Sequence, residues 1–212
     1  MNTRSLRFGG LLLAALFSAI ATAGFSAEPA GAVYHRKSGL ISGWSSTVWG
    51  NLNVEPSKAV VKEAGGLSLL VTPTAVASPY AGLQIACDGP GGIALTPALR
   101  KNGAVYLYLR NGTDVSGKPA ASQVLQVMLS FQPDGGKVVN GAYEQVVLDQ
   151  APADEKAPPV WQLVKISIPT QLQGRVDPAT PVKLHGVYVQ YVDQPMAGYF
   201  VGECNVVAAP AK

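Results

Sequence analysis

Apolar and polar residues alternate along much of this 212-residue chain with the period of two that is typical of β-strands. The clearest example is AVYLYLR, residues 104–110, whose aliphatic side chains share one face while Tyr106, Tyr108 and Arg110 share the other. This pattern predicts a strand that buries its aliphatic face and presents an aromatic and basic face outward.

Two longer segments, 123–131 and 183–193, repeat the alternation. In each segment, aliphatic residues and one aromatic residue share the predicted core face. The predicted outward positions are Gln126, Met128 and Ser130 in the first segment and Tyr188 and Gln190 in the second.

Shorter segments extend the same pattern. Apolar runs near Gly, Pro and Asp turns predict further strands at 67–72, 143–149, 163–168 and 199–207. No segment after the first 23 residues has the period of a helix. The chain is therefore predicted to be all-β, and strands at regular short spacing indicate an antiparallel β-sandwich of jelly-roll or Greek-key type.

The first 23 residues match a secretory signal peptide. Arg4 and Arg7 precede an apolar run at 11–20, and Ala21-Thr22-Ala23 forms a small-residue cleavage site. Because the run is shorter than the roughly 20 residues that span a bilayer, cleavage is favoured over a retained anchor. We expect a signal peptide at 1–23 and one exported domain at 24–212, periplasmic or extracellular, with no membrane span after cleavage.

The charge of the expected domain excludes one class of partner. Without Arg4 and Arg7, 14 of the 16 basic residues remain against 13 acidic residues, so the domain is nearly neutral. The longest basic run is His35-Arg36-Lys37. A nucleic-acid-binding protein gathers Lys and Arg into a stripe, so nucleic acid is not expected as a partner.

The two cysteines, Cys87 and Cys204, both lie in the exported part. An oxidising compartment and an even number of cysteines favour a disulfide between them, which would join an early strand to the last one. The alternative is two separate buried thiols.

Sequence patterns for catalysis are missing. Glu144 and Asp149 lie an odd number of residues apart on one predicted strand, so they point to opposite faces rather than across a cleft. There is no G-x-S-x-G motif, and His35 and His185 are the only histidines. The chain is therefore not expected to be an enzyme, and no cysteine and histidine cluster indicates zinc.

Aromatic and amide side chains remain as candidates for ligand binding. Sugars pack their C–H faces on aromatic rings and pair their hydroxyls with amides and charged groups. The candidates are Trp44, Trp49, Tyr80, Tyr106, Tyr108, Arg110, Gln126, Tyr188 and Gln190. If the strands that carry them are neighbours, they form one polar and aromatic surface; the alternative is that tyrosine occupies exposed strand positions through propensity alone.

The tryptophans have two possible roles. Trp44 and Trp49 are an odd number of residues apart, so an extended segment sends their rings to opposite faces. The sequence leaves open which ring faces the core. Trp161 begins an alternating strand and is expected in the core.

Several motifs resemble the galactose-binding-like jelly rolls, a group that includes many carbohydrate-binding modules of exported bacterial proteins. The opening AVYHRKSGLISGWSSTVWG is similar to a "VY-x-D-x-L-x-x-GW-x-x-x-x-WG" start, and WQLVKISIP to a "W-x-x-V-x-I-x-L-P" strand. GLSLLVTP, YAGLQI, HGVYVQYVD and GYFVGECNV resemble other strands of these modules. The resemblance implies a jelly-roll fold and binding of a polysaccharide or glycan.

The same resemblance raises the question of calcium. Many relatives hold a structural calcium ion with acidic residues near the two ends of the domain, where this chain has His35-Arg36 and Gly202-Glu203. No cofactor is therefore expected, although Asp88, Asp193 and Glu203 carry the oxygen ligands that calcium prefers.

Three functional hypotheses follow. The first is an exported, non-catalytic carbohydrate-binding domain that uses an aromatic and amide surface. The second is a structural or interaction domain that holds protein partners in the cell envelope. The third is a hydrolase or lyase on a jelly-roll frame.

Overall fold

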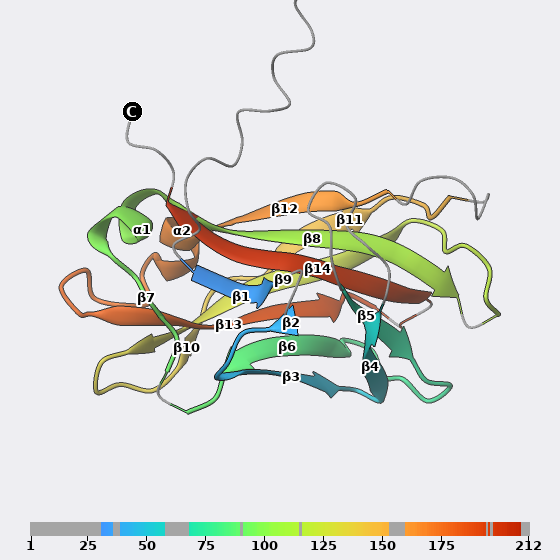
Figure 1. The fold of residues 1–212 in the computed structure, drawn as a ribbon, viewed down its shortest axis with the longest axis horizontal. Coiled ribbons are helices and arrows are strands. Elements are labelled where there is room, and N and C mark those ends of the chain that lie inside the picture. The colour runs from blue at the N-terminus through green and yellow to red at the C-terminus, as the bar shows by residue number, and fades with distance from the viewer. Residues whose placement is uncertain are drawn as a thin grey trace, which may run out of the picture.

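The computed structural model describes residues 31–35, 39–57, 68–89, 91–114, 116–152, 160–193, 195 and 197–208. Within these residues, two antiparallel sheets of seven strands each pack against one another (Figure 1). The predicted signal peptide lies outside the described residues. No helix in the described part of the chain has the length and apolar character needed to cross a membrane.

The two sheets are named sheet 1 and sheet 2. Sheet 1 contains β1 (Gly31–His35), β2 (Gly39–Leu40), β4 (Leu52–Ser57), β5 (Ser68–Pro73), β8 (Gly103–Asp114), β12 (Gln162–Ser167) and β14 (Ala197–Ala208). Sheet 2 contains β3 (Trp44–Trp49), β6 (Gly82–Cys87), β7 (Ile93–Ala94), β9 (Gln123–Pro133), β10 (Val139–Asn140), β11 (Glu144–Leu148) and β13 (Val182–Tyr191).

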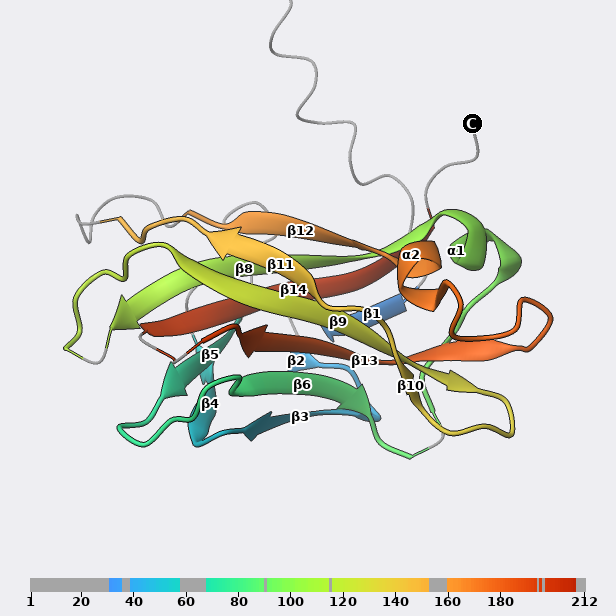
Figure 2. The same cartoon turned by 180° about the vertical axis from the view of Figure 1, so that it is seen from behind.

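The strand order is that of a jelly roll. In sheet 1 the order β5-β14-β8-β12 packs against the order β6-β13-β9-β11 in sheet 2. The chain crosses between the sheets so that neighbours within each sheet are mostly distant in sequence, as Figures 1 and 2 show from opposite sides. The antiparallel β-sandwich expected from the sequence is confirmed, and its topology is the jelly roll.

The core lies between the sheets and is built by the alternating strands. The aliphatic residues of β8 and the inward residues of β9 are all fully buried, with Leu107 and Leu129 as examples. Burying each such side chain stabilises the fold by about 1.5 to 3 kcal/mol. The period of two therefore assigns one face of each strand to the core.

Two short helices correct the expectation that no helix follows the signal peptide. They are α1 (Pro97–Asn102) and α2 (Ile168–Leu172). The Thr96 hydroxyl accepts a hydrogen bond from the Leu99 N–H at 3.3 Å, and each helix carries proline in its first turn, where the missing N–H is tolerated. Helices of six and five residues are too short to produce a visible helical period.

The predicted disulfide is wrong, because Cys87 and Cys204 are both free thiols. Cys87 is the last residue of β6 in sheet 2, whereas Cys204 lies within β14 in sheet 1. Facing sheets pack about 10 Å apart, and a disulfide joins Cα atoms roughly 4.4 to 6.8 Å apart. Burial raises the pKa of the Cys204 thiol to about 12, and burial beside Asp88 also raises the pKa of Cys87.

Thiol titration tests this correction. In denaturant without reductant, we expect both cysteines of each chain to react with Ellman's reagent. In the folded protein, the reaction is expected to be slow, because the thiolate is the nucleophile and both thiols have raised pKa values. A denatured chain with no reactive thiol would restore the disulfide.

Candidate functional site

The nine predicted binding residues do not form one surface. Tyr106, Tyr108 and Arg110 lie on the outer face of sheet 1, because their strand β8 pairs with β12 and β14. Gln126 and Gln190 lie on the outer face of sheet 2, in the adjacent strands β9 and β13. The premise that all these strands are neighbours is therefore wrong, and the structure separates the candidates onto opposite sides of the sandwich.

The outer face of sheet 2 gathers aromatic and amide side chains from five adjacent strands. Its first cross-strand row contains Trp49, Gly82, Gln190, Gln126 and Gln145. Its second row contains Thr47, Gln84, Tyr188 and Met128. We call these two rows, with the adjoining Tyr143, the amide face.

Hydrogen bonding orders the amides of this face. The Gln190 Nε2 group donates to Gln126 Oε1 at 3.2 Å, which joins β13 to β9 above the sheet. Each amide group has further donor and acceptor capacity beyond a single such bond. None of the residues in the two rows is charged. The face thus offers neutral hydrogen-bonding groups at regular strand spacing.

Trp49 anchors one end of the amide face. Its ring is half-buried and lies 6.2 Å from the Tyr188 ring, centroid to centroid, at an angle of 57°. The indole Nε1 donates to the Tyr80 carbonyl at 2.7 Å. A Cβ atom at Gly82 would lie only 2.5 Å from the indole, so glycine on β6 is what lets the ring lie across that strand.

The structure decides which of the two tryptophan rings faces the core. Trp44 is 9% exposed and packs in the core between the sheets. Trp49 lies on the opposite side of the same strand, on the amide face. The alternation predicted one ring in and one ring out, and the structure assigns Trp44 to the inside.

Two turns that are hydrogen-bonded to each other, one after β3 and one between β5 and β6, flank Trp49. Gly50 and Asn51, in the turn that follows β3, have positive φ angles of 76° and 61°. Tyr80, in the loop before β6, has a φ of 59°. The Asn51 carbonyl accepts the Thr74 hydroxyl at 2.8 Å, and the Asn51 amide donates to the Val76 carbonyl at 3.0 Å. Positive φ is unfavourable for a bulky residue such as tyrosine, so Tyr80 has a strained backbone at the point where its carbonyl accepts the Trp49 indole N–H.

Tyr80 and Tyr143 extend the aromatic character of the region. The Tyr80 ring is 57% exposed, while its carbonyl holds the Trp49 indole. Tyr143 is 46% exposed and lies just before β11. Burial and the nearby Tyr188 hydroxyl raise the pKa of Tyr143, which places these two tyrosines close together.

Sequence reasoning missed some members of this face. Tyr143, Gln84 and Gln145 were not among the predicted binding residues, although the outward parity of the predicted strand at 143–149 contained the signal for two of them. Conversely, Met128 and Ser130 of β9 and Gln190 of β13 lie on the outer side of sheet 2 by register but are buried, which corrects their expected exposure.

The residues predicted on sheet 1 have other surroundings. The Arg110 guanidinium lies 4.3 Å from the Phe200 ring centroid and 5.7 Å from that of Trp161. Trp161 is half-buried beside Phe200 rather than in the core, which corrects its expected position. The residue precedes the first paired residue of β12, on the outer parity of that strand.

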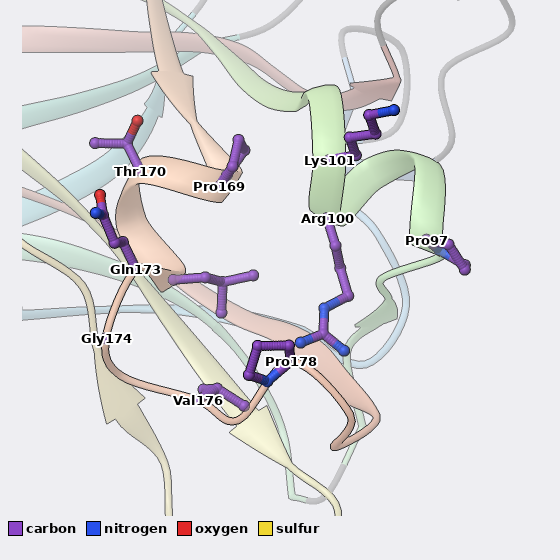
Figure 3. Close-up of a pocket in the computed structure, with 10 residues that line it drawn as sticks. Pro97, Arg100, Lys101, Pro169, Thr170, Gln173, Gly174, Val176 and Pro178 are labelled. Carbon is purple, nitrogen blue, oxygen red and sulfur yellow. The ribbon is translucent and has the colours of Figure 1, made fainter.

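A hollow of about 890 Å³ lies between α1 and α2 (Figure 3). Figure 1 shows both helices at one end of the sandwich. Arg100 extends across it and donates to the carbonyls of Thr180 at 2.8 Å and Asp177 at 3.2 Å. The guanidinium therefore fixes the loop that follows α2. None of the residues that line the hollow is aromatic, so it lacks the chemistry of the amide face.

The acidic residues of the described chain do not gather into a metal site. No three of the His, Cys, Asp and Glu residues that the structure describes come together in a metal-binding group. Asp88 accepts a hydrogen bond from the Ser45 hydroxyl at 2.7 Å, and Glu203 accepts from the Asn205 amide at 2.8 Å. With Asp193 exposed after β13, the three calcium candidates do not converge.

The two candidate catalytic carboxylates, Glu144 and Asp149, have different surroundings. Glu144 accepts a hydrogen bond from Gln171 of α2 at 2.7 Å, which places it at the inner rim of β11. Asp149 is exposed beyond the end of that strand. His185 is half-buried, and the side chain of His35 is outside the described part.

No family model matches this chain, and no curated protein matches it. Among solved structures, it is similar to the C-terminal family 22 carbohydrate binding module of Clostridium thermocellum Xyn10B, with 19% identity and a TM-score of 0.48 over 87% of this chain and 99% of that chain. The xylan-binding domain of Paenibacillus barcinonensis Xyn10C is similar at 15% identity and a TM-score of 0.46, over 90% and 100%.

A carbohydrate-binding module of the β-sandwich superfamily is similar at 18% identity and a TM-score of 0.47. The match covers 83% of this chain and 61% of that one, so this chain spans about three fifths of that structure's length.

Proposed function

We propose that this protein is an exported, non-catalytic domain that binds a neutral polysaccharide across the amide face. The observation that carries the proposal is the uncharged cross-strand arrangement of Trp49, Tyr188 and four glutamines on five adjacent strands. Aromatic rings pack against the C–H faces of sugar rings, and amides exchange hydrogen bonds with hydroxyls. The two kinds of group lie side by side here.

The dimensions and charge of the face support a chain-like, uncharged ligand. Strands are about 4.8 Å apart, so the first row extends over about 19 Å across five strands. A linear glycan can follow such a row and meet several amides in succession. Because the rows contain no charged residue, binding is expected to change little with salt.

The cellular setting is part of the proposal. Export rests on the signal peptide expected at 1–23, which would deliver the domain at 24–212 to the periplasm or the extracellular space. Polysaccharides of the cell envelope or the surroundings are available there.

A second candidate function is a protein-interaction domain of the cell envelope. Val124 and Val147 are a directly paired, exposed apolar couple beside the amide row. Exposed apolar patches often mark protein contacts. Polysaccharide binding distinguishes the two candidates, because a protein-binding surface would retain no glycan.

Replacing Tyr188 by alanine tests the proposed face. We expect affinity for a neutral polysaccharide to fall about tenfold, since the ring lies beside Trp49 on the same face and each 1.4 kcal/mol corresponds to a factor of ten. Affinity electrophoresis in gels containing xylan, β-glucan or mannan measures this. Tyr106→Ala is the matched control, because Tyr106 is a half-buried tyrosine on the outer face of the other sheet.

Two outcomes would contradict the proposal. Migration of the parent protein that no neutral polysaccharide retards would contradict the proposal and favour the protein-interaction function. Equal effects of Tyr188→Ala and Tyr106→Ala would show that the amide face is not the binding surface.

A further inference from the structure

The outer face of sheet 1 carries a second constellation, centred on Arg110. This arginine lies in the middle of a cross-strand row, with Phe200 of β14 as its register partner on one side. Trp161, just before β12, flanks it on the other side. The two rings are 6.3 Å apart in an edge arrangement at 66°, and the guanidinium lies against both.

The Arg110 guanidinium has no acidic partner in the part of the chain that the structure describes. Its Nε group donates a long hydrogen bond of 3.4 Å to the Asn111 carbonyl, and its other contacts are the two rings. Burial alone lowers the pKa of this guanidinium, with no carboxylate raising it. A partly desolvated cation with free Nη donors is therefore held in a fixed orientation.

Nearby acidic residues do not neutralise this charge. Glu203, the closest acidic residue on β14, accepts a hydrogen bond from Asn205. Glu55 lies in the same row but is separated from Arg110 by Phe200 and Leu70. Among the residues that the structure describes, the site therefore keeps a positive charge that complements an anionic group.

The shape of the donor selects the anion. A guanidinium has its donors in a planar fork that matches the two oxygens of a carboxylate, and packing on aromatic rings fixes that fork in advance. Leu163 of β12 is exposed on the same face and adds an apolar side chain near the guanidinium. A ligand that suits both features carries its carboxylate on a flat body with C–H groups.

We propose that Arg110, held between Phe200 and Trp161, binds the carboxylate of a uronic acid residue in an acidic polysaccharide. The pyranose ring of a uronic acid provides the flat body, and its carboxylate meets the guanidinium fork. This surface lies on the opposite side of the sandwich from the amide face, so the domain has one surface for neutral glycans and another for acidic ones. Its failure or success is independent of neutral polysaccharide binding.

Affinity electrophoresis in polygalacturonate gels tests the proposal. We expect the parent protein to be retarded and Arg110→Gln to lose about tenfold in affinity, while both proteins bind neutral polysaccharide equally. Arg110→Lys keeps the charge but not the fork, so it should bind between the two. Retardation should weaken as salt increases from about 0.05 to 0.5 M, because this contact is ionic.

Two controls are needed to interpret the gel results. Circular dichroism of Arg110→Gln checks that the fold is intact, and Trp49→Ala should leave polygalacturonate binding unchanged, because Trp49 lies on the other sheet. An unretarded parent protein, or equal retardation of parent and Arg110→Gln, would overturn the proposal. Equal retention by poly-L-glutamate gels would also overturn it, because the site would then recognise acidic protein segments rather than uronic acids.

Discussion

Replacing Trp49 by alanine is expected to weaken binding of a neutral polysaccharide by roughly 30- to 160-fold, which corresponds to about 2 to 3 kcal/mol. The reason is that Trp49 provides the largest ring of the amide face and lies over Gly82 beside Tyr188. Isothermal titration calorimetry with a soluble oligosaccharide measures the loss. Trp49→Phe should recover part of the affinity, since it keeps a ring but loses the indole N–H that the Tyr80 carbonyl holds.

Trp44 provides the contrasting substitution. Trp44→Ala removes a core side chain, so we expect a loss of about 3 to 5 kcal/mol in the free energy of unfolding. The fraction that remains folded should bind glycan normally. If Trp49→Ala left the affinity unchanged while Trp44→Ala reduced it, the assignment of the two rings would be reversed.

Replacing Asn111 by alanine is expected to lower the free energy of unfolding by about 3 to 4 kcal/mol. Asn111 is 2% exposed, and its amide donates to the carbonyls of Ala121 at 2.7 Å and Asp149 at 3.1 Å. Its Oδ1 atom accepts from Gln123 Nε2 at 2.6 Å. The substitution leaves these groups without their partner in a buried place, and that desolvation cost exceeds the value of an ordinary surface contact.

Urea denaturation followed by circular dichroism measures this effect. Asn53→Ala is the matched control, because Asn53 is exposed on β4 and its removal should change stability by less than about 0.5 kcal/mol. A Gln123→Ala variant and the double variant complete a cycle in which the two effects are not additive, since the side chains share a hydrogen bond. A loss below about 1 kcal/mol for Asn111→Ala would contradict the structural role of this residue.

The strands of this fold were predictable because their signal is local. Alternation at 104–110 assigned the core face of β8 correctly, and the same pattern located β9 and β13. The short helices were missed, because five or six residues cannot display a helical period against a strand background. The disulfide was wrongly predicted from cysteine number and compartment, since neither contains the distance between the two thiols.

The candidate site was only partly predictable, because the outward face of a strand is a local property and the order of the strands is not. Outward parity placed Gln126, Tyr188 and Gln190 on the outer side of sheet 2, because parity depends on each strand alone. It could not show that β8 belongs to the other sheet, and so it placed Arg110 on a surface with residues it never meets.

The sequence by itself determined the all-β class, the core face of each long strand and the opposite orientation of Trp44 and Trp49. These properties follow from the period of the backbone over a few residues. Only the tertiary structure decided which Trp faces the core, that the two thiols stay free, and which strands lie side by side. Strand order depends on pairing between segments far apart in the chain, so a surface built across five strands exists only once the jelly roll has closed.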